Sequence, residues 1–77
     1  MESKLKKSLD LRGVACPMNF VKTKIALAAL QKDELLEVIL DEGEPAANVP
    51  RSVEGEGHII VEEQDSGSTV KIVIKKG

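Results

Sequence analysis

Cys16 is the one cysteine of this 77-residue chain, and a lone thiol has two ordinary uses. It fills a gap as a small hydrophobic side chain, or it reacts as a thiolate. Pro17 has a φ angle already suited to the first helical position, so the sequence predicts a helix that begins there. The helix dipole and free amides would favour the thiolate of Cys16, with Arg12 adding to that field. A thiolate attacks other sulfur atoms, but local physics alone leaves both uses open.

His58 is the only other side chain that suggests thiol or metal chemistry. Together Cys16 and His58 supply two ligands, whereas a structural zinc site typically needs four, so we expect no metal. A thiol hydrolase that pairs Cys16 with His58 is conceivable, yet no oxyanion donor or third orienting group can be named. We favour the simpler interpretation that His58 begins a strand and satisfies nearby backbone groups.

Hydrophobic periodicity predicts the elements that position Cys16. Alternation at residues 8–12 indicates a short strand, and residues 18–31, free of glycine and proline, form the clearest helix. Residues 35–40 read as a buried strand, and Pro50 predicts that the helix in residues 44–57 is short or interrupted. Two final strands flank the turn-forming residues 64–68. The order β-α-β-α-β-β predicts an α/β two-layer sandwich with both helices on one face of a four-stranded sheet.

The same patterns predict which side chains are buried. The core positions of the sheet are Leu9, Leu11, Val38, Leu40, Val70, Ile72 and Ile74, with Ile60 beside them and Val73 on the opposite face. In the first helix one stripe suited to the sheet contains Phe20, Thr23, Leu27 and Leu30. A second apolar stripe contains Val21, Ile25 and Ala28. It either packs on another helix, which we favour, or faces a partner.

Composition limits the possible functions. The length fits one domain at residues 8–77, preceded by a flexible tail at residues 1–7. The net charge of −2 and the single aromatic residue, Phe20, argue against nucleic-acid binding. No apolar run suggests a signal peptide or a bilayer span, and a single cysteine forms no internal disulfide. We therefore expect a cytoplasmic protein.

Residues 9–17 read Leu-Asp-Leu-Arg-Gly-Val-Ala-Cys-Pro, which resembles the motif that opens TusA/SirA-family proteins. The resemblance continues more weakly through Asp41, Pro50 and His58. It implies a mixed four-stranded sheet and a cysteine used in persulfide relay. In that case Cys16 carries the sulfur and Pro17 begins its helix. The resemblance assigns support of the loop to Asp10, Arg12 and Gly13.

One position departs from the family pattern Cys-Pro-x-Pro, because Asn19 stands where the second proline is usual. Asparagine has the backbone N–H that proline lacks, so we expect a less rigid first turn with one more donor facing the thiol. The partners of this chain need not be those of the best-known branch. Transfer-RNA thiolation, sulfur assimilation, cofactor synthesis and selenium metabolism all remain compatible.

The resemblance predicts a sulfur carrier that takes sulfur as a Cys16 persulfide from a cysteine desulfurase or a rhodanese and passes it to an acceptor thiol, without a cofactor. Lys22, Lys24 and Arg51 are candidates for docking acidic partner surfaces, or they simply solvate the helices. Two other functions stay open. One is a noncatalytic binding module that uses the exposed helix stripe, and the other is a redox switch at Cys16.

Overall fold

Four strands form one mixed sheet in the computed structural model, which describes residues 5–15 and 17–77. The strands are β1 (Leu5–Asp10), β2 (Leu35–Asp41), β3 (Ile59–Asp65) and β4 (Thr69–Lys75), in the spatial order β1-β2-β4-β3. β1 and β2 are parallel, while β4 is antiparallel to both of its neighbours. The edges of the sheet are therefore β1 and β3.

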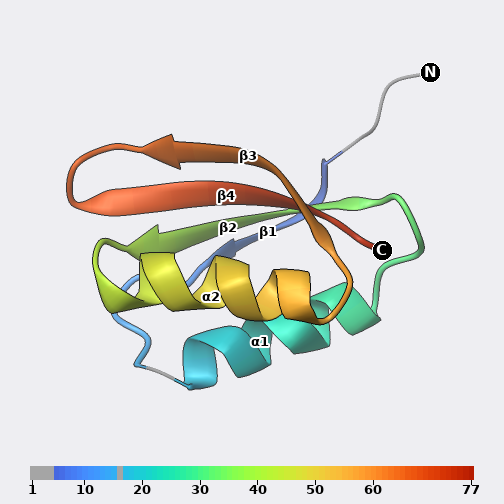
Figure 1. The fold of residues 1–77 in the computed structure, drawn as a ribbon, viewed down its shortest axis with the longest axis horizontal. Helices are drawn as coiled ribbons and strands as arrows, with labels where there is room; N and C mark the ends of the chain where they lie inside the picture. The colour runs from blue at the N-terminus through green and yellow to red at the C-terminus, as the bar shows by residue number, and fades with distance from the viewer. Residues whose placement is uncertain (1–4, 16) are drawn as a thin grey trace.

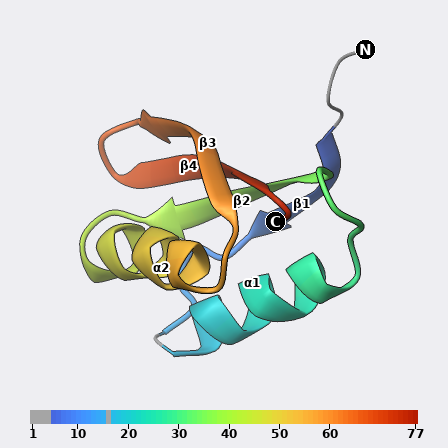
Figure 2. The same cartoon turned by 45° about the vertical axis from the view of Figure 1, so that its right-hand side comes forward.

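Two helices, α1 (Met18–Ala28) and α2 (Glu44–Gly55), lie on one face of this sheet and leave the other face open (Figure 1). The view turned by 45° shows the same two layers (Figure 2). The predicted β-α-β-α-β-β order and the α/β two-layer fold are thus confirmed.

The core lies between the sheet and the helices, where period-two alternation in the strands meets the apolar stripes of the helices. Its most deeply buried apolar side chains are Leu36, Val38 and Leu40 of β2, Ile72 and Ile74 of β4, Leu27 of α1, and Val49 and Val53 of α2. Leu11 and Val70 are also buried, and Leu9 and Ile60 pack against the cluster. The predicted core is confirmed, with Val73 outside the cluster, although the prediction omitted Leu36.

Several predicted boundaries shift. β1 begins at Leu5 and not at residue 8, so it overlaps the expected tail, and β3 extends to Asp65 through part of the expected turn. α1 ends at Ala28, before the predicted residue 31. Leu30 is still buried because the chain continues with backbone hydrogen bonds from Ala29 and Leu30 back into the last turn. Hydrophobic periodicity predicted where these elements lie in the sequence. Their end residues depend on hydrogen bonds in the folded chain.

The expectation that Pro50 interrupts the second helix was wrong. α2 runs through Pro50 without a break, although this proline removes one backbone donor. Val49 and Val53 are one helical turn apart and are both fully buried. Their burial against the sheet outweighs the local preference, because packing of an apolar face supplies most of a helix's stability in a folded protein.

The second apolar stripe of α1 does not pack on another helix, contrary to the interpretation favoured from the sequence. Val21 and Ala28 are exposed, and Ile25 exposes 66% of its surface. The stripe predicted to face the sheet is the buried one, since Thr23, Leu27 and Leu30 are buried and Phe20 is partly buried. Figure 2 shows α2 beside α1 over the same face of the sheet.

Membrane spanning was tested on the helices that the structure describes. Neither is long and apolar enough to cross a membrane.

Candidate functional site

The candidate site lies where the two parallel strands end. β1 and β2 point the same way, so the loops that follow them meet at one end of the sheet. Both helices begin from these loops, and α1 and α2 start at the same end of the molecule (Figure 1). The loop between β1 and α1 contains Cys16, which lies outside the described residues. The residues before and after it in the chain, Ala15 and Pro17, are described.

The first half of this loop is fixed to the sheet. Leu11 is buried, and its N–H donates to the carbonyl oxygen of Ile39 at 2.9 Å. A tight turn follows, in which the N–H of Val14 donates to the Leu11 carbonyl at 3.1 Å. Gly13 has a φ of +80°, a left-handed conformation that favours glycine at this motif position. The turn directs the chain from β1 toward the start of α1.

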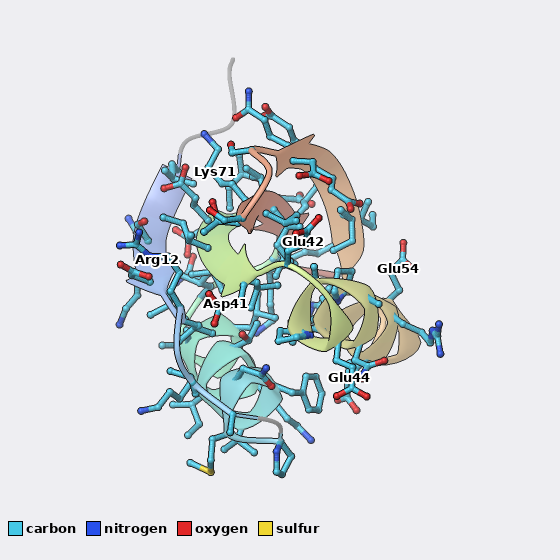
Figure 3. All side chains as sticks on the ribbon, turned by 90° about the vertical axis from the view of Figure 1, so that its left-hand side faces the viewer. Arg12, Asp41, Glu42, Glu44, Glu54 and Lys71 are labelled. Atoms are coloured by element: carbon cyan, nitrogen blue, oxygen red, sulfur yellow. The ribbon has the colours of Figure 1, made fainter. Side chains whose placement is uncertain are left out.

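Asp41, the last residue of β2, ties the turn to the neighbouring strand. Its Oδ2 accepts a hydrogen bond from the N–H of Gly13 at 2.6 Å, a short bond of the charge-assisted kind. Figure 3 shows Asp41 at the end of β2, beside the loop that leaves β1. From the sequence, Asp41 was only one of the weaker matches to the family, and no role was predicted for it. An acidic residue ending a strand parallel to β1 was the available signal.

Asp10 and Arg12 pair with each other beside this turn. Arg12 Nη2 lies 2.6 Å from Asp10 Oδ2, and Arg12 Nε donates to Asp10 Oδ1 at 2.8 Å. These side-chain bonds, helped by the Arg12 backbone N–H, lower the pKa of Asp10 to about 2 and raise the pKa of Arg12. The guanidinium charge is thus matched locally. Arg12 is therefore held beside the turn by Asp10, and its role in supporting the loop stays a prediction.

The N-terminus of α1 is open to solvent. Ala15, Pro17 and Met18 are exposed, and the N-cap residue Pro17 makes no side-chain hydrogen bond to the backbone N–H groups of this end. Pro17 is the N-cap residue with a φ of −94°. It therefore precedes the helix, whereas the sequence predicted it as the first helical residue. The N–H of Val21 donates to the Pro17 carbonyl at 3.0 Å. An uncapped helix N-terminus favours an anion.

Asn19 does not leave its backbone N–H free, which corrects the expectation of an extra donor in the first turn. Its backbone N–H donates to the Ala15 carbonyl at 3.2 Å. Its side chain is fully buried, with Oδ1 accepting from the Phe20 N–H at 2.7 Å. Nδ2 finds no hydrogen-bond partner among the described residues. Asn19 therefore shapes the first turn from inside, and Thr23 secures that turn by donating from Oγ1 to the Asn19 carbonyl at 2.9 Å.

The three basic residues predicted for docking do not form one patch. Lys24 lies 3.7 Å from Glu56 and so links α1 to the residue after α2. Lys22 lines a groove between α1 and β1. Arg51 is exposed on α2. Of the three, only Lys22 lines this groove, together with apolar residues such as Leu9 and Ile25.

His58 lies at the opposite end of the molecule from the loop that carries Cys16. It follows the C-terminus of α2, whereas that loop precedes the N-terminus of α1 (Figure 1). Its Nδ1 accepts a hydrogen bond from the N–H of Gly77 at 3.0 Å. Burial, followed by the charge of Lys76, lowers the pKa of His58. The preferred prediction, that His58 satisfies local backbone groups, is confirmed, and a pairing with the loop is excluded by this separation.

These features define a class of small α/β proteins in which a motif loop connects an edge strand to an exposed helix N-terminus. Residues 7–76 match the family model described as Sulfurtransferase TusA. The chain therefore belongs to the TusA family, and the sequence-based recognition is confirmed.

Relatives from other organisms support this assignment. A protein of Archaeoglobus fulgidus provisionally named as a sulfur carrier is 42% identical over 69 residues, which cover 88% of this chain and 78% of the relative. A similarly named protein of Methanocaldococcus jannaschii is 40% identical over 70 residues, covering 91% and 93%. The crystal structure of a SirA-like protein from Desulfitobacterium hafniense shares the fold, with a TM-score of 0.80, 24% identity and coverage of 94% and 99%.

Proposed function

We propose that this protein carries sulfur as a persulfide on Cys16 and passes it between two protein thiols. The observation that carries the proposal is the exposed start of α1 immediately after Cys16-Pro17, where the N-cap residue adds no side-chain hydrogen bond. A helix N-terminus stabilises a negative charge, and both the thiolate and the persulfide of Cys16 are anions. Membership of the TusA family and the names of the relatives support the same function.

The proposed cycle has two exchange steps. The Cys16 thiolate attacks the outer sulfur of a persulfide on the donor, and a new S–S bond forms while the donor cysteine leaves as a thiolate. An acceptor thiolate then attacks the outer sulfur of Cys16 persulfide. The S–S bond to Cys16 breaks, and Cys16 leaves as the thiolate. Each step exchanges one S–S bond for another, so the cycle needs no oxidant, reductant or cofactor.

The donor in this proposal is a cysteine desulfurase or a rhodanese, and the acceptor is a cysteine of another protein. Both must reach Cys16 in turn, and the exposure of Ala15, Pro17 and Met18 fits that requirement. The hydrogen bond from Gly13 to Asp41 and the brace between Asp10 and Arg12 hold the loop for either partner. In this scheme the side chains of Asp10, Arg12 and Asp41 position the loop, as does the backbone N–H of Gly13. None of these groups touches the transferred sulfur.

Intact-mass measurement tests the proposal. The protein is incubated with a desulfurase, pyridoxal phosphate and cysteine, and the expected product has gained the mass of one sulfur atom, which a reducing agent removes. The control Cys16→Ser should gain nothing. If wild-type protein stays unmodified with the desulfurase, and then with a rhodanese and thiosulfate, while a known carrier loads in parallel, sulfur carriage is wrong. The binding-module alternative would then gain support from the exposed stripe of α1.

A further inference from the structure

A groove of about 480 Å³ runs between the edge strand β1 and helix α1. Figure 3 shows these two elements at the same side of the molecule, with β1 above α1. The groove begins beside the motif loop, since Val14 is part of its wall. The lining residues that matter here are Lys7 and Leu9 of β1, Val14 of the loop, and Lys22, Ile25 and Ala26 of α1.

The floor of the groove is apolar and joins the exposed stripe of α1. Leu9, Val14 and Ala26 are in the groove, and Ile25 belongs to both the groove and the stripe. Met18 lies two turns before Ile25 on the same side of the helix and is 49% exposed. A continuous apolar surface of this kind, with polar residues at its border, is typical of a site for another protein.

The border of the groove is positively charged. Lys7 and Lys22 form no ion pair with any residue in 5–15 or 17–77, whereas Lys6 and Lys24 each have a glutamate partner. One carboxylate, that of Asp10, also lines the groove, but Arg12 neutralises it. The groove therefore favours a ligand that brings carboxylates to two lysines.

β1 offers backbone groups as well as side chains. It pairs with β2 on one side and is the last strand of the sheet on the other. An edge strand presents a row of N–H and C=O groups to which an extended segment can be added. Lys7 stands two residues before Leu9 and so points to the helix side of the sheet. An inward-pointing lysine on an edge opposes pairing with an uncharged strand and selects one that carries a carboxylate.

We propose that an extended segment of the partner protein, with alternating acidic and apolar residues, binds in this groove and pairs with β1. Its carboxylates face Lys7 and Lys22, and its apolar side chains cover Leu9 and Ile25. That this partner is the sulfur donor or acceptor rests on the function proposed above. A second copy of the chain is the weaker occupant, because it would offer the lysine-containing edge of its own β1 to a groove that is already bordered by Lys7 and Lys22.

An NMR titration of the isotope-labelled protein tests this site. The probe is a synthetic six-residue peptide with alternating valine and glutamate, blocked at both ends, and the matched peptides replace glutamate with glutamine or with lysine. The glutamate peptide should produce saturable shifts of the backbone signals of Lys7, Leu9, Lys22 and Ile25. Its affinity should exceed that of the glutamine peptide by about tenfold and should fall with salt. Equal binding of all three peptides, no binding, or shifts confined to β3 would overturn the proposal.

Charge reversal locates the site on the protein. The double variant Lys7→Glu/Lys22→Glu should lose binding of the glutamate peptide and gain binding of the lysine peptide, which a merely unfolded protein could not do. Lys32→Glu, an exposed lysine beyond the other end of α1, is the matched control and should bind as wild type does. Concentration-dependent shifts along β1 without peptide would show that a second copy occupies the edge, and this outcome contradicts the proposal.

The docking proposal for the groove and the proposed persulfide function can be disproved independently. Peptide binding should persist in Cys16→Ser, so it stands even if no sulfur is ever loaded. Loading of Cys16 by inorganic polysulfide needs no docking segment and should be equal in wild type and in Lys7→Glu/Lys22→Glu. Loading with no peptide binding would overturn the groove alone, whereas binding with no loading would overturn the carrier function alone.

Discussion

The C-terminal end of α1 is closed by a distant side chain, whereas its N-terminal end receives no side-chain hydrogen bond from its N-cap residue. Lys76, just after β4, donates from Nζ to the carbonyl oxygens of Leu27 at 2.6 Å and Leu30 at 3.2 Å. This ammonium group neutralises the negative end of the helix dipole. At the other end Pro17 provides no side-chain cap, and the positive end faces solvent next to Cys16.

This contrast separates stability from chemistry within one helix. The closed end is joined to the sheet by the backbone hydrogen bonds that connect Asp33 and Glu34 with Lys76, each 2.9 Å long. The open end depends on the loop from β1, which is fixed by Gly13 and Asp41. Changes at the closed end should therefore alter the free energy of unfolding alone, and changes at the open end should also alter sulfur loading.

The largest effect is expected at the closed end, where Leu27 anchors the helix in the core with 2% of its surface exposed. Leu27→Ala should lower the free energy of unfolding by about 3 kcal/mol, because it removes buried methyl groups and leaves a cavity. Ile25→Ala, on the exposed stripe, should change it by less than about 0.5 kcal/mol. Urea denaturation followed by circular dichroism measures both. Equal losses would mean that the exposed stripe is packed in solution.

At the open end, Asp41→Ala should loosen the motif loop. The variant loses the charged acceptor of the Gly13 N–H and should be destabilised by about 1 to 2 kcal/mol. Its rate of sulfur loading from a desulfurase should fall several-fold under conditions where the protein stays folded. Asp41→Asn keeps one oxygen acceptor and should be intermediate. The neighbouring exposed residue Glu42 supplies the control Glu42→Ala. If folded Asp41→Ala is loaded with sulfur as fast as wild type, Asp41 does not contribute to the function of the site.

At the closed end, Lys76→Ala should cost about 1 kcal/mol of unfolding free energy through loss of the two carbonyl contacts and the dipole interaction. Its loading rate per folded molecule should equal that of wild type. Lys75→Ala is the matched control, since Lys75 makes only an exposed pair with Asp33 at 3.8 Å. If Lys76→Ala loads slowly while it remains folded, the two ends of α1 are not independent.

The smallest effect concerns pH. The pKa of Asp10 is about 2 in the folded protein, below its ordinary value of 3.8. Asp10 therefore stabilises the fold above pH 3.8, and this contribution is lost as the pH falls toward 2. Asp10→Asn should remove that part of the pH dependence of the urea midpoint, by an amount that shrinks with salt. Glu63→Gln on β3 is the exposed control. Unchanged pH dependence in Asp10→Asn would show that the pair with Arg12 does not form in solution.

The fold was largely predictable because period-two and helical patterns are strong in β2, β4 and α1. The continuous α2 was not, since the burial of Val49 and Val53 that carries it through Pro50 is a tertiary effect. The motif identified the loop, but not the contact between Gly13 and Asp41, whose partners are far apart in sequence. The sheet-facing stripe of α1 was predictable, but the exposure of Ile25 was not, because it depends on where α2 packs relative to α1.

A pulse and chase with radiolabelled sulfur tests sulfur carriage at Cys16 most directly. The protein is loaded by a desulfurase with labelled cysteine, separated from the donor, and given a thiol acceptor. We predict that one label per chain binds in a form sensitive to reducing agents, moves to the acceptor, and leaves Cys16 able to load again. Label that binds equally to Cys16→Ser, or that stays on the protein when the acceptor is added, would contradict the carrier function.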